Sequence, residues 1–325
     1  MNKHAIPAVK RFCHAVAILL VWGLTIVPVF CADFSFNTYA KQPTAWFAGT
    51  EARQIADNVL TFQTVEGGWP KRVDMAQQAA KPEQDKKATI DNEATWSQMR
   101  FLARVYNAGH DDRDKAAFMR GLDYLLKAQY PNGGWPQYYP LRKGYSCCIT
   151  YNDDAMISVM ALLRDVARGE KDFTFVDEAH RTACEKAIAS GLDCILKTQI
   201  VVNGKLTAWC QQHDEVTLVA AKARAYELPS ICSHESAGIV RYLMTIENPS
   251  PQVCASINGA MAWFEATKIE GIRVEKTKED RIVVKDASAP PVWARYYEID
   301  TNRPFFCGRD GVKKYSMDEI EQERR

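Results

Sequence analysis

Hydrophobic residues recur at helical spacing in four separate stretches of the chain. The stretches contain Ile55, Val59 and Phe62; Leu122, Leu125 and Leu126; Ile188, Leu192, Ile195 and Leu196; and, less regularly, Ile257, Trp263 and Phe264. Residues three, four or seven positions apart lie on the same face of an α-helix. The pattern therefore predicts four amphipathic helices, each buried along one face.

A glycine-containing turn that repeats along the chain follows these helices. The segment 63–71 reads Gln-Thr-Val-Glu-Gly-Gly-Trp-Pro-Lys, and the segment 129–137 reads Gln-Tyr-Pro-Asn-Gly-Gly-Trp-Pro-Gln. A looser third copy runs from Gln199 to Trp209. Glycine commonly ends a helix because it adopts left-handed backbone conformations readily. The repeat predicts helix-and-turn units in which the tryptophan of each turn packs against a helix end.

Three further helices are predicted between these units. Their expected spans are Thr89 to about Tyr106, a helix that starts at Thr150, and Glu235 to about Thr245. Asp91 and Glu93 then fall in the first turn of one helix. Asp153 and Asp154 fall in the first turn of the next. The positive end of the helix dipole favours acidic residues at such positions.

Helical hairpins at a regular spacing predict an all-α dominated (α/α) toroid, because strands do not alternate with the helices. Two β-prone pieces near the end, 281–284 and 295–299, are expected to form a small hairpin layer on one face of the ring. Residues 32–325 show no internal boundary and are expected to form a single domain. Within them, we expect 32–49 to be a surface arm and 77–87 a solvated loop.

The composition is that of an ordinary globular protein. Hydrophobic residues make up 47% of the 325 residues, charged residues make up 25%, and the formal net charge is +1. This balance argues against disorder and against a nucleic-acid partner, which requires an excess of basic residues. Nothing in the pattern indicates oligomerisation, so a monomer is expected.

The N-terminal segment 1–31 is predicted to be a secretory signal peptide. A basic opening precedes an apolar run from about Ala15 to Phe30, and the small residues Cys31 and Ala32 follow it. This layout is typical of an export signal, which places the mature protein outside the cell or in the periplasm. A retained anchor helix is the alternative. No later segment is apolar enough to cross a membrane.

Eight cysteines lie beyond the predicted signal peptide. They are Cys147, Cys148, Cys184, Cys194, Cys210, Cys232, Cys254 and Cys307. They form no paired Cys-x-x-Cys pattern, so a structural zinc site is not predicted. A chain of this size can bury a sufficient core without disulfides. We therefore expect mostly small buried thiols, with one or two bridges permitted by an oxidising compartment.

Carboxylates and guanidinium groups gather in short segments rich in glycine and aromatic residues. Asp91 and Asp153 lie in acidic segments, and Arg295 and Arg309 lie in segments with Trp, Tyr and Gly neighbours. Guanidinium groups bind carboxylates, and carboxylates bind hard divalent cations. Together they suggest a polyanion bound with a divalent cation, which points to an acidic polysaccharide.

The chain resembles the family-ten pectate lyases from about Asn37 to its C-terminus. The motifs that carry the resemblance are Gly-Gly-Trp69-Pro-Lys71, Thr-Ile-Asp91-Asn92-Glu93, Thr-Tyr-Asn152-Asp153-Asp154, Trp209-Cys-Gln211-Gln212-His213-Asp214, Arg224-Ala-Tyr226-Glu227, Glu235-Ser236-Ala-Gly, Trp293-Ala-Arg295-Tyr-Tyr-Glu and Gly308-Arg309-Asp310-Gly311. The resemblance implies a helical toroid that cleaves polygalacturonate by β-elimination with Ca²⁺. The products would be 4,5-unsaturated oligogalacturonides.

The resemblance also implies roles for charged residues. Arg309 matches the family's catalytic base, which an arginine can be only where positive neighbours and desolvation lower its high pKa. Such a base implies an alkaline pH optimum. Arg224 and Arg295 match positions that bind substrate carboxylates, and Asp91 and Asp153 match positions at the catalytic centre and the calcium site. The alternatives are internal ion pairs for the arginines and helix N-terminal acids for the aspartates.

Further polar residues are assigned to the substrate groove. They are Asn92, Asn152, Gln212, His213 and Glu227. His213 could bind a sugar hydroxyl or could equally be a buried structural histidine. Glu227 could equally be the ion-pair partner of Arg224.

Two other functions remain open at this point. A toroidal terpene cyclase or prenyltransferase would share the Gln…Gly…Trp turns, but it would need an Asp-rich or Cys/His zinc motif, which the sequence lacks. A non-catalytic binder of acidic glycans would keep Arg224 and Arg295 but would tolerate the loss of Asp153 or Arg309. Both Asp153 and Arg309 are present, which favours the enzyme.

Overall fold

The computed structural model of the chain describes residues 34–77 and 86–325. The predicted signal peptide at 1–31, the first residues of the predicted arm and most of the predicted loop at 77–87 lie outside the described residues. Residues Ala32–Arg325 group into one compact unit. In the described part of this unit, no helix combines the length and the apolar character needed to cross a membrane.

Helices dominate the described residues. They are α1 (Thr44–Phe47), α2 (Thr50–Thr61), α3 (Trp96–Gly109), α4 (Asp112–Ala128), α5 (Ala155–Ala167), α6 (Glu178–Thr198), α7 (Ser233–Met244) and α8 (Pro251–Thr267). The strands are short and are β1 (Ile149–Thr150), β2 (Val201–Val202), β3 (Lys205–Leu206), β4 (Gln212–His213), β5 (Ile231–Cys232), β6 (Ile272–Lys276), β7 (Arg281–Lys285), β8 (Tyr296–Tyr297), β9 (Pro304–Cys307) and β10 (Lys313–Lys314).

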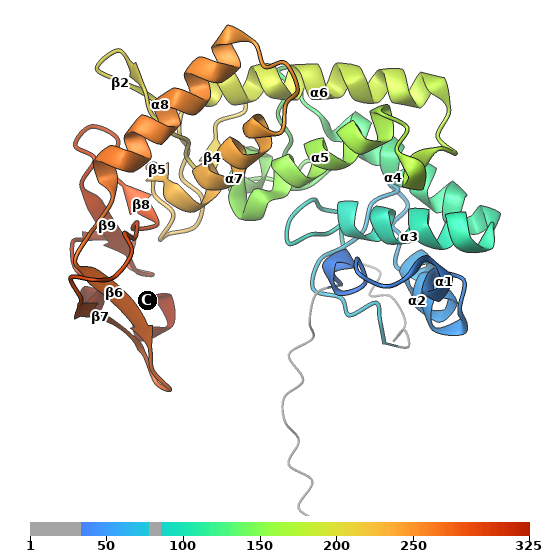
Figure 1. Cartoon of the computed structure of the whole chain (residues 1–325), viewed down its shortest axis with the longest axis horizontal. Helices are drawn as coiled ribbons and strands as arrows, with labels where there is room; N and C mark the ends of the chain where they lie inside the picture. The colour runs from blue at the N-terminus through green and yellow to red at the C-terminus, as the bar shows by residue number, and fades with distance from the viewer. Residues whose placement is uncertain (1–33, 78–85) are drawn as a thin grey trace, which may run out of the picture. The chain divides into compact units, whose positions relative to one another are not determined.

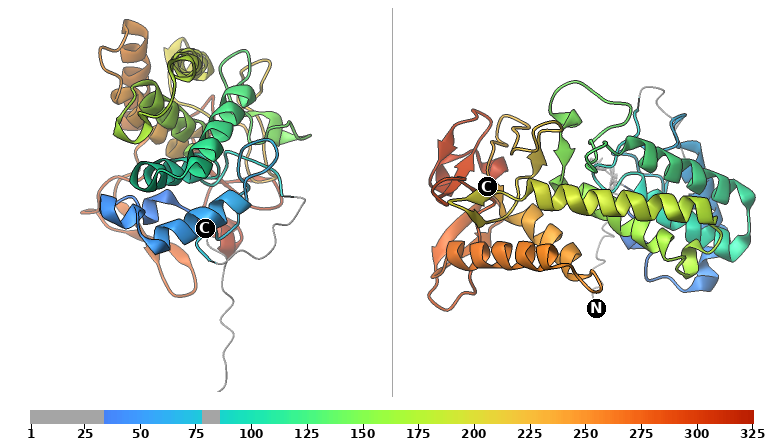
Figure 2. Two further views of the ribbon diagram at one scale, coloured as in Figure 1. Left: turned by 90° about the vertical axis from the view of Figure 1, so that its right-hand side faces the viewer. Right: turned by 90° about the horizontal axis from the view of Figure 1, so that it is seen from above.

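The helices form successive hairpins in two layers (Figures 1 and 2). Helices α3, α5 and α7 pack side by side in one layer, and α4, α6 and α8 pack side by side in the other. Each helix of the first layer also packs against the helix that follows it in sequence. One continuous apolar core fills the space between the layers. This arrangement confirms the predicted helical toroid.

The same contact occurs in the three turns of the repeat. Trp69, Trp135 and Trp209 are fully buried. Each indole N–H donates a 2.8 Å hydrogen bond to a carbonyl near the end of the preceding helix, and the acceptors are Val59, Leu125 and Ile195. A buried tryptophan needs such an acceptor for its single polar atom. The prediction that these tryptophans pack against helix ends is confirmed.

The glutamine of each turn joins one hairpin to the next. The side-chain amide of Gln129 donates to Gly133 O at 2.9 Å and to Ala187 O on α6 at 2.8 Å. Gln63 and Gln199 make the equivalent pairs of hydrogen bonds, to the carbonyls of Gly67 and Ala117 and of Thr207 and Ser256. Each glutamine side chain thus links its own turn to a carbonyl within a later helix.

Gly133 is required where its turn meets α6. Its φ of +90° lies in the left-handed region, and a Cβ atom there would collide with the carbonyl of Ser190. Any other residue would therefore suffer both backbone strain and a clash with main-chain atoms.

Two helices begin later than predicted. Helix α3 begins at Trp96 and α5 at Ala155, whereas the sequence suggested starts near Thr89 and Thr150. Thr89 forms an antiparallel bridge with Tyr138, and Thr150 lies in β1, which pairs with β4. These pairings hold both threonines in extended backbone, so neither can cap the helix that follows.

The acidic residues before α3 and α5 are therefore not in first helical turns. Asn92 and Glu93 have φ of 51° and 62°, and Asp153 and Asp154 have φ of 53° and 56°. Left-handed backbone is uncommon outside glycine and is tolerated best by Asn and Asp. These short connections present carboxylates at the ends of neighbouring helices instead of placing them within the helices.

The β structure also differs from the prediction. Residues 281–285 form β7, which pairs with β6 in a hairpin, while β8 lies in a separate four-stranded sheet of order β10-β9-β8-β5. The two predicted strands thus do not pair with each other. The predicted surface arm is wrong for the described residues, because Phe34, Phe36 and Phe47 are buried in the core.

All eight described cysteines are free, and six of them are buried. The expectation of mostly small buried thiols is confirmed. The sequence also allowed one or two disulfides, and the described cysteines form none.

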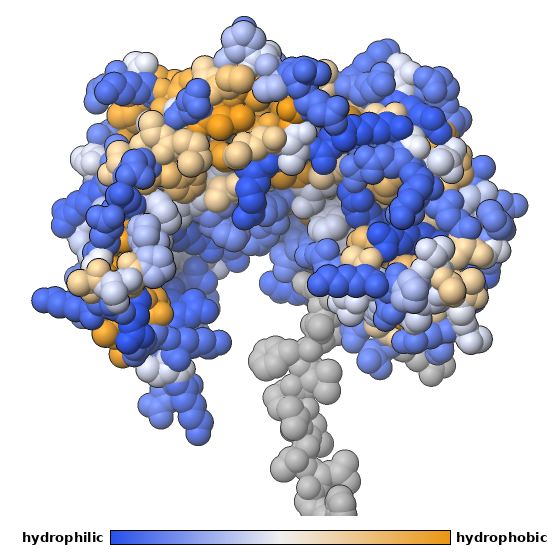
Figure 3. Space-filling view, in the orientation of Figure 1, coloured by the Kyte–Doolittle hydropathy of each residue, from blue (hydrophilic) through white to orange (hydrophobic). Residues whose placement is uncertain are grey.

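The surface over α7 and α8 carries a group of hydrophobic residues, while hydrophilic residues line a hollow between the β strands and α3 (Figure 3).

Candidate active site

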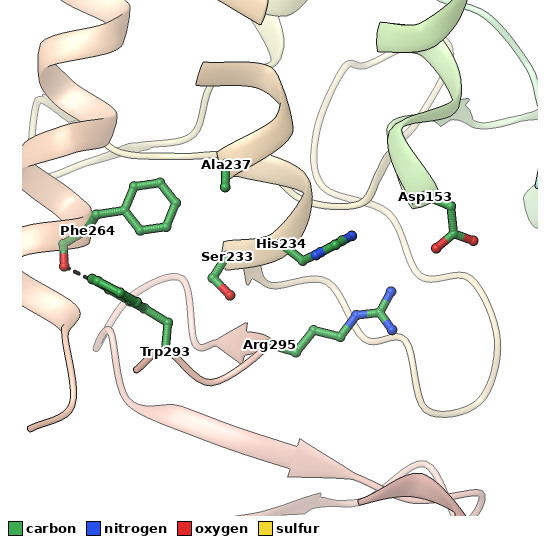
Figure 4. Close-up of a pocket in the computed structure, with 7 residues that line it drawn as sticks. All are labelled: Asp153, Ser233, His234, Ala237, Phe264, Trp293 and Arg295. Atoms are coloured by element: carbon green, nitrogen blue, oxygen red, sulfur yellow. Dashed lines mark hydrogen bonds between the residues drawn. The ribbon is translucent and has the colours of Figure 1, made fainter. Parts of the chain in front are cut away.

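A pocket of about 490 Å³ is lined by residues from the turn before α5, from α7 and α8, and from the segment before β8. Its lining residues are Asp153, Ser233, His234, Ala237, Phe264, Trp293 and Arg295 (Figure 4). The guanidinium of Arg295 points toward Asp153 at one end, and the two aromatic rings lie at the other. The pocket is large enough for a sugar-sized ligand. Two of the residues predicted from sequence, Asp153 and Arg295, thus lie in one cavity.

A chain of hydrogen bonds connects the charged end of the pocket. Asn152 donates from Nδ2 to Asp153 Oδ2 at 2.6 Å, and its Oδ1 accepts from Arg295 Nη2 at 3.4 Å. The same Arg295 nitrogen donates to Glu235 Oε1 at 3.0 Å. Asn152 is buried and Glu235 is fully buried. Asn152 therefore fixes the position of Asp153 relative to Arg295, although 142 sequence positions separate those two residues.

Glu235 holds Arg295 as a charged group. Burial lowers the pKa of Arg295, but attraction to Glu235 reverses this effect, so the pKa lies above its usual value. Burial raises the pKa of Glu235, and the positive charge of Arg295 opposes that rise. Among the described residues, the hydrogen bonds of Arg295 use Nη2 alone. The rest of the guanidinium fork is free to bind a carboxylate that enters the pocket.

The three predicted arginines extend from one small hydrophobic cluster. Its buried members are Cys210, Tyr226, Cys232, Tyr296, Phe305 and Cys307. The guanidinium of Arg224 lies 5.0 Å from the ring centre of Tyr226, and that of Arg295 lies 5.3 Å from the ring centre of Tyr296. Arg309 follows Cys307 by two positions and interacts electrostatically with Tyr226. The cluster thus brings side chains that are distant in sequence to one face.

Arg224 is anchored by Glu227. The guanidinium donates from Nε to Glu227 Oε2 at 2.7 Å and from Nη2 to Oε1, and Arg224 N also donates to Oε2 at 3.0 Å. Hydrogen bonding to Glu227 raises the pKa of Arg224. Glu227 is only 2% exposed, so it positions Arg224 and has little surface to offer a substrate.

Arg309 lies in the most open surroundings of the three. Its side chain is exposed and donates from Nε to Glu323 Oε1 at 2.5 Å, and its main-chain N–H donates to Glu321. The hydrogen bond to Glu323 raises the pKa of Arg309. A base requires the opposite shift, and Arg309 does not line the pocket, so this arrangement does not by itself assign the role of base to Arg309.

Asp91 lies in a separate part of the structure. It is 2% exposed and forms an ion pair with Lys71, and its N–H donates to Thr89 Oγ1 at 3.1 Å. Its Oδ1 is buried and has no hydrogen-bond partner in the described residues. Asn92 follows in left-handed conformation. Asp91 precedes α3 as Asp153 precedes α5, and these two helices pack together.

Gln212 and His213 are buried behind the site in β4, with exposed fractions of 2% and 0%. His213 accepts at Nε2 from Cys210 N at 3.2 Å, and its Nδ1–H donates to Leu218 O at 2.9 Å. Both ring nitrogens are therefore used by the main chain. The structure contradicts the idea that His213 binds a sugar hydroxyl and favours the structural alternative. Gln212 is equally inaccessible to a substrate in this conformation.

The buried His213 is expected to make the protein sensitive to acid. Burial lowers the pKa of His213 to about 4, below about 6.5 in an unfolded chain. The unfolded chain therefore takes up the proton first as the pH falls. The stabilisation is complete above about pH 6.5 and declines by about 3 kcal/mol as the pH falls to 4. Urea unfolding between pH 7.5 and 4 should show this loss.

The variant His213→Asn should remove that part of the pH dependence, because asparagine does not titrate. His110→Asn is the matched control, since His110 is exposed and its left-handed φ of 55° suits asparagine. An unchanged pH slope in His213→Asn would contradict the prediction, whatever the variant's absolute stability.

Several site residues were not singled out from the sequence. They are Lys71, His234, Glu235 and Trp293. All except His234 belong to the motifs that carry the family resemblance. A buried glutamate in the first turn of α7 gave no sequence signal of its own, because the same pattern is typical of an ordinary helix start.

The candidate calcium ligands are carboxylates. Among residues 34–77 and 86–325, no three His, Cys, Asp or Glu side chains come together as a metal-binding group. However, Asp153 lines the pocket, and Asp91 has a buried oxygen without a partner. Ca²⁺ prefers oxygen ligands of this kind and accepts several from a bound ligand. Asp153 is thus a candidate ligand inside the pocket and Asp91 a candidate outside it, so a calcium ion in the pocket would need most of its oxygen ligands from an anionic substrate.

The chain matches a known protein family over most of its length. The family model for pectic acid lyase matches residues 63–325. No curated protein sequence matches the chain at a significant level.

Two solved structures are similar to the chain over most of its length. One is a family 10 polysaccharide lyase from Cellvibrio cellulosa, with a TM-score of 0.80, 34% sequence identity, and coverage of 89% of this chain and 88% of that chain. The other is an aspartate-to-alanine mutant of the same enzyme in complex with trigalacturonic acid. Its TM-score is 0.79 at 34% identity, with coverage of 90% of this chain and 93% of that chain.

Proposed function

Because the chain belongs to the pectic acid lyase family, we propose that it cleaves polygalacturonate by calcium-assisted β-elimination, with Arg309 as the base. The base removes the proton at C5 of the sugar beside the scissile bond. The glycosidic oxygen then leaves from C4, and a 4,5-unsaturated product forms. Export by the segment 1–31 and action as a monomer in the secreted or periplasmic space belong to the same proposal.

The chemistry requires positive charge around the substrate carboxylate. A C–H proton beside a carboxylate is very weakly acidic, since its removal adds charge to an anion. Arg295 and Arg224 are each anchored by a buried glutamate and keep further N–H donors for a uronate. Fixed cationic donors of this kind stabilise charge that develops in the transition state.

Calcium would act on the substrate carboxylate. Asp153, with Asp91 as the further candidate, would hold the ion together with substrate carboxylates. Bound there, it would neutralise the carboxylate whose neighbouring C–H is to ionise. Asn152 keeps Asp153 in place through the 2.6 Å hydrogen bond.

One observation supports the proposal most strongly. Asp153 and Arg295 face each other in one pocket and are linked through Asn152, and Arg224 and Arg309 extend from the hydrophobic cluster that also supports Arg295. A pocket in which a carboxylate faces a guanidinium group, with two further arginines on the cluster that supports it, suits a polyuronate with a bridging cation.

The test is an assay of purified protein with polygalacturonate. With calcium, we expect a rise in ultraviolet absorbance from the unsaturated product, and we expect a chelator to abolish it. Release of reducing ends without the absorbance would indicate hydrolysis and would contradict β-elimination. An undiminished rise with chelator would contradict the calcium requirement alone.

One of the two alternative functions is excluded by the family, and the other is decided by the assay. The family assignment removes the terpene cyclase or prenyltransferase alternative. A non-catalytic glycan binder would bind polygalacturonate without either absorbance or new reducing ends, so the same assay separates it from the enzyme.

A further inference from the structure

The end of the pocket opposite Asp153 is aromatic. Trp293 is 38% exposed, although Trp263 close by in the same aromatic group is only 4% exposed. Its ring lies against Phe264 with centroids 5.9 Å apart and ring planes at 85°. Figure 4 shows both rings at the opposite end of the pocket from Asp153, with Ser233, Ala237 and His234 between. A large exposed aromatic side chain in a cavity is a feature that core packing does not explain.

The indole of Trp293 is held in a fixed orientation. Its N–H donates to the carbonyl of Phe264 at 2.9 Å, and the perpendicular Phe264 ring supports it from one side. Because the only polar atom is already used, the accessible part of the ring is an apolar π surface. Such a surface suits the C–H face of a pyranose, and little side-chain freedom would be lost on binding.

The backbone places Trp293 directly beside the carboxylate-binding arginine. Ala294 between them is buried, donates its N–H to Tyr297 Oη at 3.0 Å and accepts from Ser233 Oγ at 2.8 Å. Trp293 and Arg295 therefore flank an inward-facing residue and both line the pocket. Their Cα atoms can be at most about 7 Å apart, since two residues of extended chain span no more. From these neighbouring positions the two side chains extend toward opposite ends of the pocket, so the indole and the guanidinium can contact different units of one sugar chain (Figure 4).

We propose that Trp293, supported by Phe264, is a sugar-stacking subsite for the unit adjacent to the uronate bound by Arg295. The proposal rests on polygalacturonate as the substrate and adds how the enzyme selects chain length. A sugar on the indole would lie against Ala237, whose small side chain leaves room. His234 lies between the two subsites and can form a hydrogen bond with a hydroxyl of the bound chain.

The consequence is a preference for longer chains. A long substrate always places a unit on the indole when another unit is bound by Arg295, whereas a short oligomer can also bind in registers that leave the indole empty. Trp293 should therefore affect binding of long substrates and leave the chemical step alone.

The experiment compares Trp293→Ala and Trp293→Phe with the native enzyme on trigalacturonate, hexagalacturonate and polygalacturonate. Trp293→Ala should raise KM for the two longer substrates by about 10-fold, with kcat and the KM for trigalacturonate changed less than about 2-fold. Trp293→Phe should recover most of the affinity. Met261→Ala, which truncates an exposed side chain of α8 that does not line the pocket, is the control and should match the native enzyme.

A second measurement keeps the test independent of turnover. Binding of hexagalacturonate in the presence of a chelator should quench tryptophan fluorescence of the native protein, and Trp293→Phe should lose most of that quenching. Equal KM ratios for short and long substrates, or unchanged quenching in Trp293→Phe, would overturn the subsite. Failure of the native protein to form unsaturated product would instead overturn the proposed function, and the fluorescence result would still decide the subsite.

Discussion

Replacement of Asp153 by asparagine is expected to lower kcat on polygalacturonate by about 10²- to 10³-fold, the loss typical of one electrostatic element of a catalytic site. The change removes a negative charge from the pocket but keeps the shape of the side chain. Asn152 can still donate to the remaining oxygen at this position, and the left-handed φ of 53° suits asparagine. The calcium concentration needed for half-maximal activity should rise in the same variant.

The neighbouring residue provides a matched control. Asp154 has nearly the same backbone conformation, with φ of 56°, but it faces Gly238 and Arg241 and does not line the pocket. Asp154→Asn makes the same chemical change one position away and should retain near-native turnover. Full activity of Asp153→Asn, or an equal loss in both variants, would refute the special role of Asp153.

The helical layers could be predicted because they depend on local rules. The spacing of residues such as Val59, Leu125 and Ile195 reports which face of a helix is buried. The repeated Gln and Trp of each turn report a unit that recurs. These signals need no knowledge of distant contacts, so the helical hairpins and the toroid follow from the sequence.

The starts of α3 and α5 could not be predicted for a physical reason. Threonine followed by acidic residues is the usual pattern of a helix N-terminus. Here Thr89 and Thr150 are instead held in bridges to Tyr138 and Gln212, which are remote in sequence. Tertiary pairing overrides the local preference, and the carboxylates of the next residues become part of the site.

The polar residues of the site show the same division. The sequence identified Asp153 and Arg295, and the structure brings them into one pocket. It did not distinguish Asn152 as their link or Glu235 as the anchor of Arg295, because these roles depend on contacts among the turn before α5, α7 and the segment before β8. The sequence suggested His213 as a substrate-binding residue, but its buried ring forms hydrogen bonds with main-chain atoms through both nitrogens.

Arg309→Ala is expected to lower kcat by about 10²- to 10⁴-fold, the range for loss of a general base, while substrate binding changes little. Arg224 and Arg295 bind the carboxylates in this scheme, so their replacement should weaken binding instead. Arg303→Ala is the control, since Arg303 is an exposed arginine that stacks on Tyr315 beside the same sheet. If Arg309→Ala kept near-native turnover and Arg224→Lys were inactive, Arg224 and not Arg309 would be the base.

The ion pair with Glu323 gives a sharper test of Arg309. A base must be deprotonated, so activity should rise with pH until the pH reaches the pKa of the base. Glu323 raises the pKa of Arg309, and Glu323→Gln should therefore lower that pKa and move the rise in activity to lower pH. Neither Glu323 nor its hydrogen bond belongs to the pocket. If Glu323→Gln left the pH profile unchanged while Arg309→Ala was inactive, Arg309 would act in another way than as the base.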